Sequence, residues 1–172
     1  MIFVTVGSQL PFDRMIEAID EVAPLLQGKE IIAQVEGSNY TPKHFKTLAY
    51  IAPADYKSYI NNAELVISHA GTGTILSVSQ MKKPLIVFPR LGNLRETRNN
   101  HQMATCKMLE SLCNLQVAYN KDELREKIQS YLKGELPIME EISPYASDQM
   151  LNSIKSFIET EKKFVITPAP TL

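Results

Sequence analysis

The residues with the clearest chemical potential lie in three polar segments, each of which directly follows a short apolar run. Residues 7–9 are Gly-Ser-Gln, residues 68–74 are Ser-His-Ala-Gly-Thr-Gly-Thr, and residues 89–102 form a longer polar stretch. Hydroxyl, amide and guanidinium groups in these segments are hydrogen-bond donors, and small residues expose the backbone N–H groups beside them. The chemistry that such donors suit is the binding of an anionic, oxygen-rich ligand.

The segment 68–74 is the most informative of the three. Its small residues leave backbone N–H groups uncovered where a helix is expected to begin, and the helix dipole favours an anion there. Thr72 and Thr74 add hydroxyl groups, so the segment predicts a cradle for a diphosphate. It lacks the third glycine and the spaced acidic residue of the dinucleotide fingerprint, and it has no Gly-Lys-Ser/Thr of a Walker A loop. His69 alone is more typical of a hydrogen-bonded structural histidine than of a catalyst.

The other two segments are each open to two interpretations. Residues 7–9 by themselves are more typical of a strand-to-helix turn than of a binding loop. Residues 89–102 carry three arginines and one glutamate, which would clamp a phosphate or a sugar, or would be solvated charges on a surface loop with Asn100 as a helix N-cap.

The sequence argues against metal and cofactor chemistry. No Asp-x-Asp pair is present to hold a divalent cation on a diphosphate, and there is no His/Cys cluster with metal-ligand spacing and no Gly-x-Ser-x-Gly elbow. We therefore expect no cofactor and no metal, and a bound diphosphate would be neutralised by a helix dipole and backbone donors.

The elements that must position these segments alternate between strand and helix. The pattern predicts a doubly wound, Rossmann-like α/β fold whose parallel sheet binds ligands at the carboxyl ends of its strands. Strands are expected at 2–6, 30–35, 47–51, 65–68, 84–88 and 115–119, and helices at 12–26, 55–61, from 72 onward, 101–112, 120–134 and 147–160.

Composition narrows the class of protein further. The chain has 172 residues, 44% of them hydrophobic and 22% charged, which is ordinary for one globular domain. Its net charge of −1 argues against nucleic-acid binding. Cys106 and Cys113 are seven residues apart on one predicted helix, too far for a disulfide, and free thiols fit the cytoplasm. No apolar run is long enough to span a bilayer and no signal peptide is visible, so any membrane association is expected to be peripheral, through a partner.

Taken together, the motifs MIFVTVGSQLPFDRMI, AELVISHAGTGTI, KPLIVFPR and ETRNNHQ resemble the C-terminal-domain family of glycosyltransferase family 28. The similarity covers about the first two thirds of the chain, in order and with matching spacing. Within this family, the chain resembles small stand-alone subunits. These are the cytosolic subunit of the dolichol-linked UDP-GlcNAc transferase and the paired bacterial capsule and exopolysaccharide transferases.

The resemblance implies the donor-binding half of a GT-B glycosyltransferase that uses a UDP-sugar. Transferred by matching motif, Gly7, Ser8 and Gln9 face the diphosphate, and residues 70–74 form the phosphate-binding helix start, next to His69. The residues of that helix start are Ala70, Gly71, Thr72, Gly73 and Thr74. The side of the site that binds uracil, ribose and sugar is lined by Pro89, Arg90, Glu96, Asn100, His101 and Gln102. Many relatives have a glutamate for the ribose hydroxyls where this chain has Ser77, so that contact does not carry over.

The resemblance also implies a missing half. Single-chain relatives contain an acceptor-binding half that this chain lacks, and in split systems a membrane-anchored subunit supplies it. The expected reaction is an inverting, metal-independent transfer of a hexose or N-acetylhexosamine to a lipid-linked acceptor in polysaccharide synthesis. The catalytic base is expected in the partner, with Glu96 and His101 as weaker candidates. The alternatives are a non-catalytic nucleotide-sugar-binding or enhancer subunit and an unrelated flavodoxin-like module that binds FMN.

The predicted organisation is a nucleotide-sugar-binding domain at 1–160 followed by a tail at 161–172. The last helix has an apolar stripe at i, i+3 and i+4 spacing, which either covers the sheet of this domain or binds a partner. The apolar run 164–166 lies in a Pro-rich tail, and we expect it to contact the membrane-anchored subunit.

Overall fold

The computed structural model describes residues 1–8, 10–143 and 145–162. Six strands form one parallel sheet in the order β3-β2-β1-β4-β5-β6. The strands are β1 (Ile2–Thr5), β2 (Ile31–Gln34), β3 (Lys46–Leu48), β4 (Leu65–His69), β5 (Leu85–Phe88) and β6 (Gln116–Val117). This order reverses between β1 and β4, as in doubly wound nucleotide-binding folds, and it confirms the predicted fold class.

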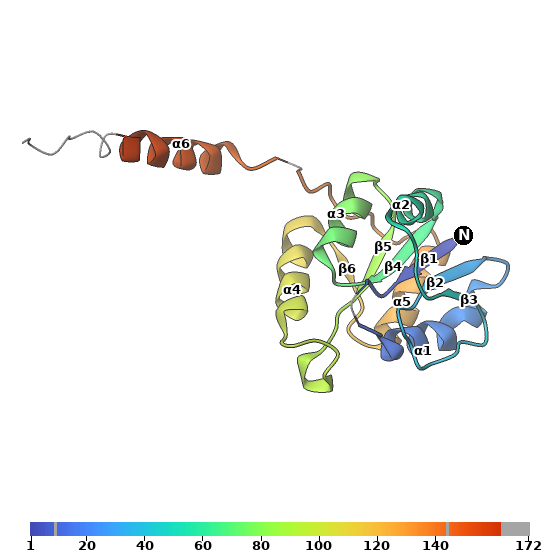
Figure 1. Cartoon of the computed structure of the whole chain (residues 1–172). Coiled ribbons are helices and arrows are strands. Elements are labelled where there is room, and N and C mark those ends of the chain that lie inside the picture. Colours follow the sequence, from blue (N-terminus) through green and yellow to red (C-terminus); the bar gives the residue numbers. More distant parts are fainter. Residues whose placement is uncertain (9, 144, 163–172) are drawn as a thin grey trace, which may run out of the picture. The chain divides into compact units, whose positions relative to one another are not determined.

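Helices cover both faces of the sheet (Figure 1). They are α1 (Asp13–Val22), α2 (Pro53–Asn62), α3 (Thr72–Gln80), α4 (His101–Cys113) and α5 (Lys121–Leu132). Side chains of α1 and α5 share one buried cluster with Ile2 and Val4, while side chains of α2, α3 and α4 share the other with Phe3. Adjacent residues of β1 thus point to opposite faces, so both faces must be apolar, which explains its continuous β-branched and aromatic sequence.

Some boundaries differ from the predicted ones for local reasons. The first helix ends at Val22 and continues as a 3-10 turn, η1 (Ala23–Leu26), because Pro24 lacks an N–H group for the α-helical ladder. A second 3-10 turn, η2 (Gly92–Leu94), lies in the third polar segment. The third strand begins and ends earlier than expected. The last strand has two residues, and both lie within the predicted range 115–119.

Two local predictions have clear outcomes. The Asn120 side chain accepts a hydrogen bond from the N–H of Glu123 at 3.0 Å and so caps α5. Asn100 does not cap α4, because its side-chain oxygen accepts from the Gly92 N–H instead. The His101 N–H donates to the Asn99 side chain. Cys106 and Cys113 are both buried free thiols, also as predicted.

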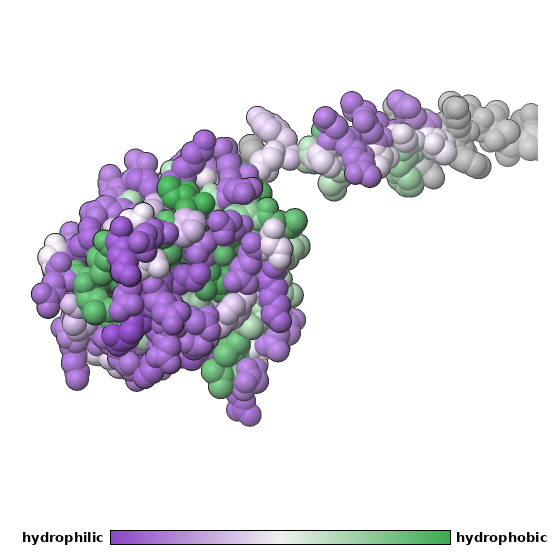
Figure 2. Space-filling view, turned by 180° about the vertical axis from the view of Figure 1, so that it is seen from behind, coloured by the Kyte–Doolittle hydropathy of each residue, from purple (hydrophilic) through white to green (hydrophobic). Residues whose placement is uncertain are grey.

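The chain divides into two compact units, Met1–Ile142 and Ser143–Leu172. The division at residue 160 that the sequence suggests stays a prediction. The second unit contains α6 (Asp148–Lys162), whose apolar atoms gather on one side (Figure 2). The run 164–166 lies outside the described residues.

Candidate functional site

A cleft of about 840 Å³ opens at the carboxyl ends of the strands, where the strand order reverses. Loops after β1, β2, β4 and β5 and the first turns of α3 and α4 surround it. Eleven of the candidate residues line this cleft, namely Gly7, Ser8, His69, Ala70, Gly71, Thr72, Gly73, Thr74, Arg90, His101 and Gln102. Gln9 lies outside the described residues, and Pro89, Glu96 and Asn100 are not among the lining residues.

The amino terminus of α3 is the main source of hydrogen-bond donors in the cleft. Gly71 is its N-cap, and the N–H of Ile75 makes the first intrahelical bond, to the Gly71 carbonyl at 3.1 Å. The backbone N–H groups of residues 72–74 precede that bond and make no backbone hydrogen bond to any described residue. A Cβ atom built on Gly73 would meet nothing within 4 Å, so the space beside its backbone is open. This helix end is arranged to receive an anion.

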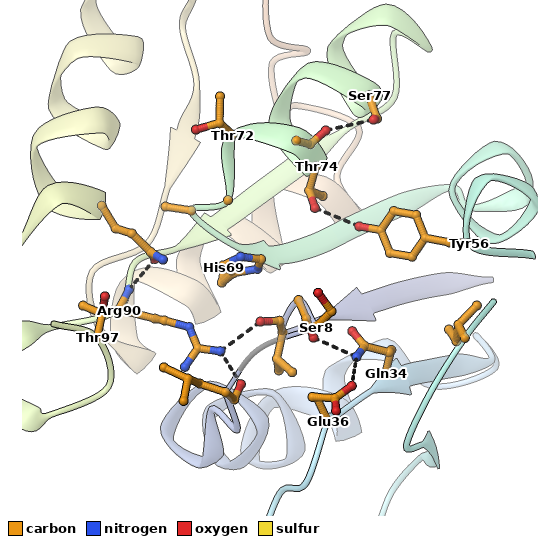
Figure 3. A pocket seen from close by; sticks show the side chains of 18 of the residues that line it. Ser8, Gln34, Glu36, Tyr56, His69, Thr72, Thr74, Ser77, Arg90 and Thr97 are labelled. Carbon is orange, nitrogen blue, oxygen red and sulfur yellow. Dashed lines mark hydrogen bonds between the residues drawn. The ribbon is translucent and has the colours of Figure 1, made fainter. Parts of the chain in front are cut away.

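His69 lies near the centre of the cleft (Figure 3), in a narrow space between Gly7 and Gly71. A Cβ atom on Gly7 would lie 2.6 Å from the imidazole Cε1, and one on Gly71 would collide with Nε2. Gly7 also has a φ of +84°, which favours glycine. The imidazole ring therefore requires both glycines, and the positive φ is a second reason for glycine at Gly7 alone.

The same position keeps His69 uncharged. Burial, with a smaller contribution from the Arg90 guanidinium, lowers the pKa of His69 from 6.5 to about 4. Its buried Nδ1 makes no hydrogen bond to any described residue. A neutral imidazole beside the α3 terminus is available to donate or accept a hydrogen bond without adding charge.

This shift predicts a pH dependence of stability. Between pH 6.5 and 4 the unfolded chain binds a proton at His69 that the folded chain does not, so stability falls as the pH falls through this window. When the pH falls from 7 to 5, we expect proton binding at His69 in the unfolded chain to lower the free energy of unfolding by about 2 kcal/mol. Urea unfolding at both pH values should show this loss in the wild type and a correspondingly smaller loss in His69→Gln. Equal losses in the two proteins would contradict it.

Arg90 connects two of the loops that surround the cleft. It is 4% exposed, and its guanidinium donates to the carbonyl oxygens of Val6, Leu10, Pro11 and Glu96 at 2.6 to 3.2 Å. The guanidinium also lies over the Phe12 ring. These donors connect the loop after β1 to the loop after β5, so they are engaged by the protein rather than free for a phosphate.

Glu96 has a comparable anchoring contact. Both of its carboxylate oxygens accept from Arg14, at 2.6 and 2.9 Å, and one of them also accepts from the Leu91 N–H. Arg14 further donates to the Pro89 carbonyl. The structure therefore places Glu96 as a support for the polar loop, outside the cleft, rather than as a base facing a substrate.

His101 and Gln102 begin α4 at one end of the cleft. The side chain of Gln102 is buried, and its oxygen accepts from the Arg90 N–H at 3.0 Å. Its amide nitrogen makes no hydrogen bond to any described residue and remains a possible ligand donor. His101 is exposed, with its Nδ1 2.6 Å from the Asn99 side chain, which fixes the ring at the cleft edge.

The opposite wall was missed by sequence reasoning. It consists of Gln34, Glu36, Tyr50, Ile51, Pro53 and Tyr56. Gln34 accepts from the Thr5 hydroxyl and donates to the Gly7 carbonyl, both at 2.8 Å, so β2 supports the loop after β1. The Tyr56 and Thr74 hydroxyls are 2.8 Å apart (Figure 3). The only available signal was that these residues follow predicted strands or begin a helix.

Carboxylates of α1 hold the loop that carries part of this wall. Asp20 accepts from the Tyr40 hydroxyl and from the N–H groups of Lys43 and His44. These hydrogen bonds keep the pKa of Asp20 below its usual value despite its burial. Asp13 similarly accepts from the Ser38 hydroxyl. The segment after Glu36 is thus fixed to the body of the domain.

Two further features bear on function. Among the described residues, no group of three or more His, Cys, Asp or Glu side chains is placed to hold a metal ion. No helix in the described part of the chain has the length and apolar character needed to cross a membrane.

Comparison with known proteins identifies relatives that are named as N-acetylglucosamine transferases or as subunits of them. The chain is 31% identical over 118 residues to the human UDP-N-acetylglucosamine transferase subunit ALG13, covering 63% of this chain and 10% of that protein. It is 31% identical over 91 residues to a Prochlorococcus marinus UDP-N-acetylglucosamine–N-acetylmuramyl-(pentapeptide) pyrophosphoryl-undecaprenol N-acetylglucosamine transferase, covering 53% of this chain and 22% of that protein. The chain thus spans a quarter or less of these relatives' lengths.

The fold is also found in a solved relative, the solution structure of ALG13. That structure superposes with a TM-score of 0.54 at 17% identity, covering 89% of this chain and 93% of the other. The family model named "Glycosyltransferase family 28 C-terminal domain" matches residues 1–159, nearly the whole described chain. The cleft, the sheet order and this match agree, and the chain belongs to the family of glycosyltransferase family 28 C-terminal domains.

Proposed function

We propose that this chain is the donor-binding subunit of a UDP-sugar transferase. In this proposal a hexose or N-acetylhexosamine, with N-acetylglucosamine as the first candidate, passes to a lipid-linked acceptor in polysaccharide synthesis. The observation that carries the proposal is the unpaired amino terminus of α3 at the strand-order reversal, inside a cleft of nucleotide-sugar size. The names of the relatives, which are UDP-N-acetylglucosamine transferases, support the choice of donor.

The two ends of the cleft suggest how the donor lies. The more apolar end of the cleft is formed by Tyr50 and Ile51, which follow β3, and by Tyr56 of α2. An end of this kind suits a planar base. His101 and Gln102 form the polar end, which suits sugar hydroxyls. The α3 terminus lies between them and would hold the diphosphate. Ser77 lines the cleft but donates to the Gly73 carbonyl at 2.8 Å.

The chemistry proposed is a single displacement with inversion at the anomeric carbon. The α3 N–H groups would stabilise the negative charge that develops on the departing UDP, so the reaction would need no metal. A base must accept the proton of the acceptor hydroxyl. We place that base in the partner, since Glu96 is bound to Arg14 and His69 is too weak a base at neutral pH, and His101 is the candidate within this chain.

Metal-free binding is directly testable. UDP is expected to bind with the same affinity in a chelator and in magnesium, because backbone donors rather than a metal neutralise the diphosphate. Titration calorimetry in both buffers measures this. An absolute requirement for a divalent cation would refute this part of the mechanism.

A second unit with an exposed apolar stripe supports a protein partner. In α6 the exposed apolar side chains cover an arc of about 120° of the helix. They are Met150, Leu151, Ile154, Phe157 and Ile158. The charged residues of α6 are acidic in slight excess, which does not favour an anionic membrane surface. We propose that α6 and the tail bind the membrane-anchored, acceptor-binding subunit.

Truncation tests this partner contact. Deleting residues 161–172 is expected to leave a UDP-binding domain that no longer co-purifies with the membrane-anchored subunit or transfers sugar to lipid. Pull-down from co-expressing cells and calorimetry with UDP are the two measurements. A matched variant, Ile154→Asp with Phe157→Asp, tests whether α6 itself takes part. Normal co-purification of both variants would place the contact elsewhere on the chain.

The alternative is a non-catalytic nucleotide-sugar-binding or enhancer subunit. It differs in one measurable way, because an enhancer that has lost donor binding would leave the partner with residual transfer activity. The purified pair carrying Gly73→Val should have no transfer activity if the donor site lies in this chain.

A further inference from the structure

One edge of the first unit has exposed basic and apolar side chains together. It consists of the loop 91–100 and the outward face of α4, and we call it the α4 edge. Its exposed apolar residues are Leu94, Met108 and Leu112, with 52%, 54% and 69% of their surfaces accessible. Figure 2 shows apolar atoms among polar ones along this edge.

The exposed charges on the α4 edge are all positive. Arg95, Arg98 and Lys107 are exposed and form no ion pair with any described residue. The two carboxylates nearby are only partly exposed, and both are hydrogen-bonded to side chains of the domain. Glu96 is bound to Arg14, and Glu110 accepts from the Tyr119 hydroxyl at 2.6 Å. This segregation is notable in a chain whose net charge is −1.

The exposed residues of α4 lie along one face of the helix. On α4, Ala104, Lys107, Met108, Ser111 and Leu112 are exposed at i, i+3, i+4, i+7 and i+8 positions. Single apolar side chains between unpaired cations are characteristic of surfaces that rest at the boundary between headgroups and acyl chains. There, apolar side chains enter the lipid while cations bind phosphate.

The edge is continuous with the cleft. His101 is the first residue of α4 and lines the cleft, as does Thr97 of the loop 91–100. Any surface that meets the edge is therefore close to the polar end of the cleft, where we place the sugar. A lipid-linked acceptor must bring its hydroxyl to that end.

We propose that the α4 edge binds the anionic surface of the membrane directly, with Leu94, Met108 and Leu112 entering the lipid and the three cations binding phosphates. The proposal rests on the proposed function, because a lipid-linked acceptor gives this contact its role. It adds a second attachment, independent of the partner subunit. A second copy of the chain is a poorer occupant, since a two-fold contact would place these cations against one another.

Vesicle sedimentation with the full chain tests the proposal. Vesicles of phosphatidylcholine alone are compared with vesicles that also contain phosphatidylglycerol, at low and high salt. The wild type should sediment with the anionic vesicles only, and less at high salt. Arg95→Gln with Arg98→Gln should weaken binding about fivefold for each arginine removed. Leu94→Ser with Leu112→Ser should also weaken it.

The matched control lies on α5 and just after it. Arg125, Leu132 and Lys133 are similarly exposed, and their replacement by Gln, Ser and Gln should leave vesicle binding unchanged. Equal binding by the α4-edge variants and the wild type would overturn the proposal. So would vesicle binding that disappears only when residues 143–172 are deleted, or the absence of wild-type binding to anionic vesicles.

A UDP titration of the same proteins separates this proposal from the proposed function. All edge variants should bind UDP as the wild type does, since Arg95, Arg98, Leu94 and Leu112 do not line the cleft. Normal UDP binding without vesicle binding rejects only the membrane contact. Vesicle binding without any UDP binding rejects the donor site and leaves the membrane contact without its role.

Discussion

Replacing Gly73 with valine is expected to weaken UDP binding by on the order of 100-fold or more. The α3 N–H groups work only if the diphosphate reaches the backbone, and loss of two charge-assisted hydrogen bonds is worth about 3 kcal/mol. A Cβ at residue 73 meets no protein atom within 4 Å, so the new side chain would occupy ligand space without straining the fold. Calorimetry with UDP measures the affinity, and thermal unfolding checks the fold.

Leu76→Val is the matched control for this substitution. Leu76 is on the same helix but does not line the cleft, so a β-branched residue there should leave UDP affinity unchanged. Wild-type affinity in Gly73→Val, with the control also unchanged, would show that the diphosphate binds away from the α3 terminus. Gly71 is unsuitable for this test, since a side chain there collides with His69.

Arg90→Ala is expected to lower the free energy of unfolding by about 3–5 kcal/mol. Four backbone carbonyls of two loops lose their donor, and the ring of Phe12 loses the guanidinium above it. Arg90→Lys should recover only part of the loss, because a single ammonium cannot reproduce the planar fork. Urea denaturation of each variant measures the effect.

Arg98→Ala provides the comparison for Arg90. Arg98 is exposed and has no ion pair among the described residues, so its replacement should change stability by no more than about 0.5 kcal/mol. Similar stabilities for Arg90→Ala and Arg98→Ala would contradict the anchoring role given to Arg90.

The sheet and about half of the residues that line the cleft could be predicted because their signals are local. The runs at β1, β4 and β5 are continuous, apolar and β-branched, and each is followed by a segment of unusual composition. Parallel strands bring their carboxyl ends to one edge, so residues 7–8 and 69–74 had to meet.

What could not be predicted depends on contacts between distant residues. Arg90 looked like a free cation in a polar loop, but its partners are carbonyls about 80 positions away in sequence. Glu96 is likewise paired with Arg14, 82 positions away. Gln34 and Tyr56 belong to the cleft only because β2 and α2 lie beside β1 and α3, and neither residue stands in a recognisable motif.

Titration of isotope-labelled protein with a UDP-sugar, followed by NMR of the backbone amides, shows directly whether the α3 terminus binds the donor. We expect UDP-N-acetylglucosamine to shift the amide signals of Gly7 and of Thr72 to Thr74 without added metal. We also expect it to shift those of His101 and Gln102 more than UDP alone does. The signals of α5 should stay in place throughout. Saturating UDP-sugar that leaves the α3 terminus unshifted, or that shifts only residues outside the cleft, would contradict this expectation.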